Sequence, residues 1–159
     1  MNLNYESKLE ALGYPLTTTT PEGKLVDAVT IDGTTIYASG QVPFNGDTLT
    51  SRGKVPSEIS VAEATQAAAL CAANVLRAVR KQIGSLDRIE RVLRVTGYVN
   101  ADADFTEEHL VINGASELLL NVFGPEGRHA RTAIGVAQLP LGASTEVEMI
   151  LKLKSESHA

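Results

Sequence analysis

The chain has 159 residues, of which 43% are hydrophobic and 21% charged, a composition typical of a globular domain rather than of a disordered or fibrous protein. We expect one domain over residues 21–154, an N-terminal extension over 1–20 and a tail over 155–159. No run of about 18 apolar residues occurs, and the polar start has no secretory signal, so we expect no membrane partner and a cytoplasmic location. A net charge of −5 and an aromatic content of 4% disfavour nucleic acid as a partner.

The first quarter of the chain predicts a short helix followed by a β-hairpin. The helix is expected around Tyr5 to Leu12. Two segments rich in β-forming residues, Leu25 to Ile31 and Thr34 to Ser39, flank a glycine and predict the hairpin. Beyond Gly40, turn residues predict a looped region with at most a short edge strand near Leu49.

The strongest helix prediction covers Val61 to Ile83. Ser60 and Glu63 have the spacing of a capping box at its start, and Gly84 lies where a C-terminal cap is expected. Cys71 falls among alanines in the middle of this helix, so we interpret it as an inert packing residue. As the only cysteine, it excludes an internal disulfide.

A strand and a second helix are predicted next. The strand is expected over Arg91 to Val99, where two sets of side chains alternate: Val92, Arg94, Thr96 and Tyr98 on one side, and Leu93, Val95, Gly97 and Val99 on the other. The helix is expected over Phe105 to Phe123, with Asp104 and Glu107 as a second capping pair and Gly124 at its end.

Two final strands are predicted over Arg131 to Ala137 and Thr145 to Lys154. We expect them to pair as a hairpin around residues 138–144. The resulting order ββαβαββ predicts an α+β two-layer sandwich, with helices on one face of a mixed sheet. The last two strands together predict a face of small and partly charged residues. We expect this face to pack against sister subunits in a homo-oligomer.

Metal and cofactor motifs are absent from the sequence. His109, His129 and His158 do not have the spacing of metal ligands, and no glycine-rich phosphate loop occurs. We therefore predict no metal and no cofactor. His109 is interpreted as a surface or packing residue, and His158 lies in the tail.

Three polar positions could contribute to a binding site. Ser39 and Gly40 end a predicted strand in a tight turn whose backbone N–H could bind an oxyanion; the alternative is an ordinary hairpin exit. Asn113 is an unusual residue for the middle of a helix, so it makes either a ligand contact or a helix-to-loop contact.

Arg131 and Glu146 are the candidate chemical groups. Small neighbours around Arg131 favour bidentate capture of a small carboxylate, with an ion pair to Glu146 or Glu148 as the alternative. Glu146 could orient or deprotonate a water, or be a solvated strand residue. In the expected hairpin, Glu146 would be displaced from Arg131 by about 13 Å along the strand, which favours a site completed by a neighbouring subunit.

Five segments resemble those of a known family. They are YASGQVP (37–43), VNADADF (99–105), INGASELL (112–119), FGPEGRHARTAIGVAQLP (123–140) and EVEMI (146–150). With these motifs the chain resembles the RidA (YjgF-like) family, and within it a longer, chorismate-mutase-like subgroup. The resemblance implies a chorismate-mutase-like fold and a homotrimer with three sites between subunits.

The resemblance also implies an activity, the hydrolysis of reactive 2-imino acids to 2-oxo acids and ammonia. Carried over by motif, Arg131 would hold the substrate carboxylate and Glu146 would position the attacking water. Gly40 would offer its backbone N–H, and Ser39 and Asn113 would line the pocket.

The chain departs from the family pattern near its first strand. Lys24-Leu25-Val26 stands where family deaminases usually carry a tyrosine, and residues 1–20 extend beyond the short members. The alternative function is therefore a non-catalytic trimer that binds small carboxylates in a regulatory role. Endoribonuclease activity is a weaker alternative because of the acidic charge. Arg128 and His129 receive no assigned role.

Overall fold

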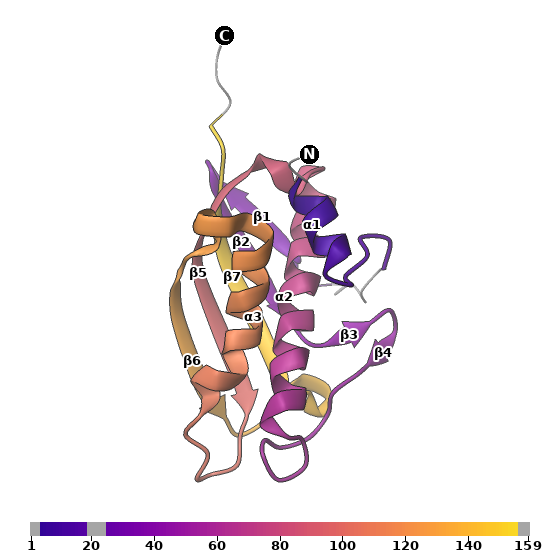
Figure 1. Ribbon diagram of the computed structural model, residues 1–159, viewed down its shortest axis with the longest axis vertical. Helices are drawn as coiled ribbons and strands as arrows, with labels where there is room; N and C mark the ends of the chain where they lie inside the picture. The colour runs from indigo at the N-terminus through magenta and orange to yellow at the C-terminus, as the bar shows by residue number, and fades with distance from the viewer. Residues whose placement is uncertain (1–3, 19–24, 156–159) are drawn as a thin grey trace.

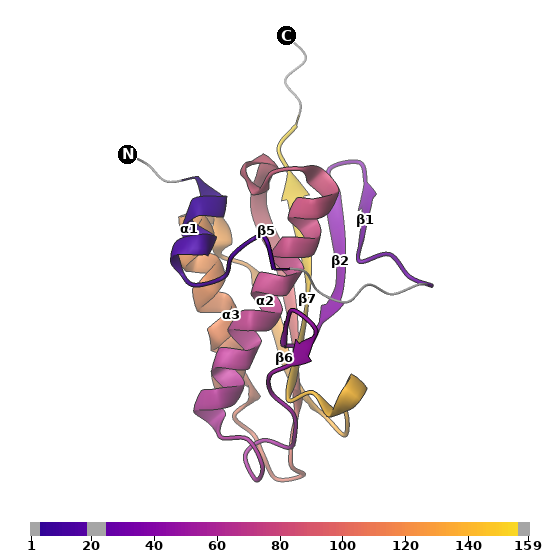
Figure 2. The ribbon, with the colours of Figure 1, turned by 90° about the vertical axis from the view of Figure 1, so that its right-hand side faces the viewer.

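The protein has two layers, a five-stranded sheet with helices over one of its faces (Figures 1 and 2). The computed structural model describes residues 4–18 and 25–155. The elements are α1 (Tyr5–Ala11), β1 (Val29–Asp32), β2 (Thr35–Gln41), β3 (Phe44–Asn45), β4 (Thr48–Leu49), α2 (Val61–Ile83), β5 (Ile89–Asn100), α3 (Glu108–Phe123), β6 (Ala130–Val136) and β7 (Thr145–Leu153). Short 3₁₀ turns are η1 (Leu86–Arg88), η2 (Gly124–Gly127) and η3 (Pro140–Gly142). The predicted α+β class and the order ββαβαββ of the main elements are confirmed.

The sheet has the strand order β1-β2-β7-β5-β6, in which β5 and β6 are parallel and the other neighbours antiparallel. The predicted hairpin between the last two strands is wrong, because β6 and β7 both pair with β5 and not with each other. The crossover through α3 places β6 beside β5 at the edge of the sheet. The chain then passes across the end of β5, where the Asn100 N–H donates to the Ser144 carbonyl, and β7 enters the centre of the sheet.

Alternation along β7 separates the core from the face without helices. Its odd-numbered residues, such as Val147 and Met149, are buried under the helices, and its even-numbered residues are half-buried on the opposite face. We call this second face the open face. Val95 of β5 pairs with Arg131 of β6 on one side and with Met149 of β7 on the other. The side chains of Arg131 and Met149 therefore lie on the same face of the sheet, the face covered by the helices. The small residues of β6 and the glutamates of β7 therefore lie on opposite faces. The predicted single face of small and charged residues is wrong.

Helix α2 has the predicted bounds and the predicted caps. The Glu63 N–H donates to Ser60 Oγ at 3.2 Å, and the Ser60 N–H donates to Glu63 Oε2 at 3.0 Å. Gly84 ends the helix at a φ of 88°, a conformation that favours glycine. Cys71 is fully buried, as expected, and burial raises the pKa of its thiol to about 12.

The second predicted capping pair does not form. Helix α3 begins at Glu108 rather than at Phe105, and its N-cap residue, Glu107, makes no side-chain cap bond. The cause lies outside the helix, because the preceding segment is held against residue 55: the Asp102 N–H donates to the Val55 carbonyl at 2.9 Å. Residues 102–105 then form a turn, in which the Phe105 N–H donates to the Asp102 carbonyl at 3.1 Å, and the helix begins only after this turn.

The N-terminal helix packs onto the domain. Leu9 is fully buried, and the ring of Tyr5 meets that of Phe123 edge-on at 4.8 Å. Strand β1 begins at Val29, four residues later than expected, and Leu25 is 97% exposed. The expectations that concern Lys24 and His158 lie outside the described residues. Among the helices of the described ranges, none has the length and apolarity needed to span a membrane.

Candidate functional site

Ser39 and Gly40 form a β-bulge within β2. Ala38 pairs with Met149 and Gln41 with Val147, so two residues of β2 stand opposite one residue of β7. The predicted turn at the end of the strand is wrong, because β2 continues to Gln41. The bulge rather than a turn therefore sets the local backbone direction.

Glu146 occupies the space beside Gly40 that a larger residue would fill. A Cβ on Gly40 would lie 2.1 Å from Glu146 Oε1 and 2.9 Å from its Cδ. The φ of Gly40 is not positive, so glycine is needed here for space and not for backbone freedom. Burial, and then the charge of Glu148, raise the pKa of Glu146. The carboxyl group is therefore more basic than an exposed glutamate.

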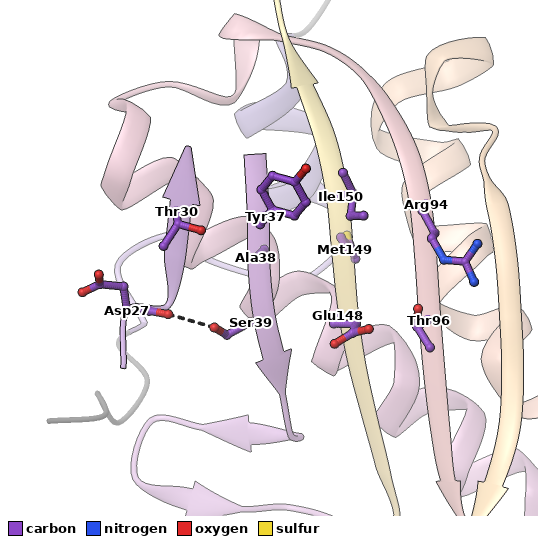
Figure 3. A pocket seen from close by; sticks show the side chains of 10 residues that line it. All are labelled: Asp27, Thr30, Tyr37, Ala38, Ser39, Arg94, Thr96, Glu148, Met149 and Ile150. Carbon is purple, nitrogen blue, oxygen red and sulfur yellow. Dashed lines mark hydrogen bonds between the residues drawn. The ribbon is translucent and has the colours of Figure 1, made fainter. Parts of the chain in front are cut away.

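A cavity of about 250 Å³ lies on the open face next to this bulge (Figure 3). Its lining residues are Asp27, Thr30, Tyr37, Ala38, Ser39, Arg94, Thr96, Glu148, Met149 and Ile150. Ser39 Oγ donates to the Asp27 carbonyl at 2.8 Å, so its lone pairs can accept from a ligand. The Tyr98 hydroxyl donates to Glu148 Oε1 at 3.1 Å, and burial and this bond raise the pKa of Tyr98.

Arg131 lies on the other side of the sheet, where β6 runs beside α3. Its Nη1 donates to Asn113 Oδ1 at 2.9 Å and to Ser116 Oγ at 3.1 Å. These two bonds use both hydrogens of Nη1. Within the described residues, Nε and Nη2 donate to no protein acceptor. The guanidinium thus presents its Nε–Nη2 edge, which suits a bidentate carboxylate.

His129 extends this cluster. Its Nδ1 lies 2.6 Å from the Gly127 carbonyl oxygen, and its Nε2 lies 3.0 Å from Ser116 Oγ. Burial, and to a lesser degree the charge of Arg131, lower the pKa of His129, although the Gly127 bond opposes them. The imidazole is therefore neutral at physiological pH.

The structure divides the predicted site residues into two groups. Ser39, Gly40 and Glu146 lie together around the bulge, whereas Arg131 and Asn113 lie together on the helix side. Strand β5 lies between Arg131 and Glu146, whose Cα atoms are about 10 Å apart across the sheet and about 10 Å along it. The alternative of an ion pair from Arg131 to Glu146 or Glu148 is therefore wrong within one chain.

Comparison with known proteins agrees with this fold and these motifs. A family described as "YjgF/chorismate mutase-like, putative endoribonuclease" matches residues 6–153. The chain belongs to the YjgF/chorismate-mutase-like family. Protein TCP17 of Trypanosoma cruzi is 38% identical over 150 residues, which are 94% of each chain.

Two solved structures superpose closely on the chain. A protein of unknown function from Agrobacterium tumefaciens has a TM-score of 0.88 and 40% identity, covering 94% of this chain and 92% of its own. A protein from Shewanella oneidensis described as a "putative endoribonuclease" has a TM-score of 0.90 and 28% identity, covering 95% of this chain and all of its own.

Sequence reasoning missed two polar contacts of this family member. Ser116 follows Asn113 by three residues on α3, and helical spacing alone places both on one face. Glu148 follows Glu146 by two residues on β7, and strand alternation places both on the open face. Both spacings were available from the sequence, but only the structure shows which partner each residue contacts.

Proposed function

We propose that this chain catalyses the hydrolytic deamination of reactive 2-imino acids to 2-oxo acids and ammonia, at sites between the subunits of a homotrimer. The observation that carries the proposal is the orientation of Arg131. Asn113 and Ser116 hold one nitrogen of its guanidinium, and the edge formed by the other two is left for a ligand.

Arg131 supplies the anchor for the substrate carboxylate. Two parallel N–H···O bonds from Nε and Nη2 fix both the position and the plane of that carboxylate. The imine carbon adjacent to it is already electrophilic. Catalysis therefore needs mainly a held substrate and an oriented water.

Glu146 supplies the base. Its raised pKa makes the carboxylate a better proton acceptor from water than an exposed glutamate. The water oxygen forms a bond to the imine carbon while its proton passes to Glu146. The C=N π electrons move to the nitrogen, and the protonated Glu146 returns its proton there, which gives the neutral carbinolamine. Glu146 then takes the carbinolamine hydroxyl proton and passes it to the nitrogen. The C=O bond forms, the C–N bond breaks, and ammonia leaves with both protons of the water. Gly40 and Ser39 lie beside Glu146, where they can contact the polar atoms of this intermediate.

Two copies of the chain are required in this mechanism. Arg131 and Glu146 lie on opposite sides of one sheet, so the edge strand β6 of one copy must approach the open face of another. The open face also exposes apolar surface, with Tyr37 48% and Ile134 42% exposed. Light scattering at micromolar concentration should give the mass of a trimer, and a monomer would overturn the intersubunit site.

The direct test measures release of ammonia and 2-oxobutyrate from enzymatically generated 2-iminobutyrate. We expect the wild type to accelerate release over buffer and Arg131→Ala to lower kcat/KM about 100-fold or more, since a bidentate charged contact is lost. Arg128→Ala removes an exposed guanidinium three residues away and serves as the matched control, with activity unchanged. Acceleration that survives Arg131→Ala would place the site elsewhere.

A non-catalytic carboxylate-binding protein is the second candidate. It is favoured by the absence of the family's usual tyrosine, since Leu25 and Val26 are 97% and 70% exposed at that position. Absence of hydrolysis, together with binding of 2-oxobutyrate that Arg131→Ala abolishes, would select this function. Endoribonuclease activity is disfavoured by the net charge of −5 and by the two glutamates on the open face.

A further inference from the structure

We propose that Ser116 and His129 are positioning residues, which form a directional hydrogen-bond chain from the Arg131 guanidinium to the Gly127 carbonyl and thereby fix the carboxylate-binding edge of Arg131. The inference rests on the proposed role of Arg131 in holding a carboxylate. It gives two side chains that do not themselves touch the substrate a role in orienting Arg131.

The direction of the chain follows from the chemistry of its last member. The Gly127 carbonyl can only accept, so His129 Nδ1 carries the hydrogen in the 2.6 Å contact. In the neutral imidazole, Nε2 is then an acceptor, and the Ser116 hydroxyl must donate to it across 3.0 Å. The lone pairs of Ser116 Oγ are left to accept from Arg131 Nη1 at 3.1 Å. Each donor in the chain thus meets one acceptor.

This chain decides which edge of Arg131 is presented. Ser116 and Asn113 take the two hydrogens of Nη1, so a carboxylate can bind side-on only at Nε and Nη2. Without the serine hydroxyl, one Nη1 hydrogen is released, and the Nη1–Nη2 edge competes for the carboxylate. The Nε–Nη2 edge is then held less firmly, and the carboxylate binds more weakly.

Protonation of His129 would break the chain. The imidazolium carries hydrogens on both nitrogens, so Nε2 no longer accepts from Ser116, and a second cation lies beside Arg131. The groups that face the ring are Arg131 from β6, Ser116 from α3 and the Gly127 carbonyl from η2. Because the pKa of His129 is lowered, the chain persists below pH 6.5 and breaks only as the pH falls through that lowered value.

The kinetic test compares Ser116→Ala and His129→Gln with the wild type in the imine hydrolysis assay. We expect Ser116→Ala to raise KM about tenfold with kcat within about twofold, since binding is weakened equally in the ground and transition states. A glutamine at position 129 keeps an acceptor but does not titrate. It should therefore retain a near-normal KM at pH 7.5 and abolish the rise in KM at acid pH. His109→Gln, which changes an exposed histidine on α3, is the matched control and should keep the wild-type pH profile.

A second readout does not depend on activity. Imidazole ¹H–¹⁵N correlation spectra of the wild type should show His129 protonated on Nδ1, with the Nε2 resonance shifted in Ser116→Ala. Protonation on Nε2 at neutral pH, or an unchanged KM in Ser116→Ala, would overturn the inference. If the wild type does not hydrolyse imines, the proposed function fails together with the positioning role. The spectrum alone then decides whether the hydrogen-bond chain exists.

Discussion

The closest packing in the candidate site lies between Gly40 and Glu146, and Gly40→Ala perturbs it with a single methyl group. The new Cβ would lie 2.1 Å from Glu146 Oε1, 2.9 Å from Cδ and 3.1 Å from Cγ. Ordinary contacts of this kind are about 3.5 Å or longer, so the carboxyl group must move by more than about 1 Å. A displacement of about 1 Å at a catalytic group can cost about 100-fold in rate, and we expect that loss in kcat/KM for 2-iminobutyrate.

The stability of Gly40→Ala should change far less than its activity. Glu146 is half-buried and the carboxyl is the far end of a flexible side chain, so it can swing away from the methyl group. Overpacking of about 1–3 kcal/mol is partly offset by the smaller entropy of the unfolded alanine chain, about 0.4–1 kcal/mol. We therefore expect a net loss of at most about 2 kcal/mol in urea unfolding. Gly46→Ala, where φ is 59° and no atom lies within 4 Å, is the control that strains the backbone without affecting activity.

A double-mutant cycle tests whether Gly40 acts through Glu146. In a Glu146→Ala background the carboxyl group is absent, so adding Gly40→Ala should cost almost no further activity. Wild-type activity in Gly40→Ala would refute the claim that the reaction rate depends on the position of the Glu146 carboxyl group. A further 100-fold loss in the double variant would show that Gly40 acts through something other than Glu146.

Three further predictions concern the scaffold. Gly114→Ala should destabilise the protein by about 3 kcal/mol in urea unfolding. Its Cβ would lie 2.0 Å from the Thr65 carbonyl oxygen, and the gain in helix propensity is only about 1 kcal/mol. A stabilised variant would contradict this close packing of α2 against α3. Cys71 should resist alkylation by iodoacetamide at pH 8 until the chain unfolds, because burial raises the pKa of its thiol to about 12. Labelling of the native protein would argue against that environment. Ser60→Ala should cost about 1 kcal/mol at pH 7. The bond from the Glu63 N–H to Ser60 Oγ does not titrate, whereas the bond from the Ser60 hydroxyl lowers the pKa of Glu63. The difference between wild type and Ser60→Ala should therefore be largest above pH 4.5 and shrink, without vanishing, as the pH falls through the lowered value. A difference that grows between pH 7 and pH 3 would count against the capping box.

Local patterns were sufficient where local contacts decide the structure. The first long helix was predicted with its bounds and both caps, because the Ser60–Glu63 bonds and the Gly84 conformation involve only residues next to the helix ends. The alternation along β7 was predicted for the same reason, since consecutive side chains of a strand must point to opposite faces.

Local patterns failed where distant segments compete. The pair Asp104 and Glu107 has a capping spacing, yet the bond from Asp102 to Val55 and the turn from Asp102 to Phe105 delay the start of the helix until Glu108. The bulge at Ser39 and Gly40 depends on the pairing of β2 with β7, which sequence spacing does not reveal.

The sequence by itself determined the element order, the bounds and caps of α2, the alternation along β7, and the residue types available for the proposed chemistry. Only the tertiary structure decided which strands are neighbours. Insertion of β7 between β2 and β5 places Arg131 and Glu146 on opposite sides of the sheet with β5 between them. Strand order is set by long-range backbone pairing and by burial of whole faces under α2 and α3, and neither is encoded in the spacing of residues along one segment.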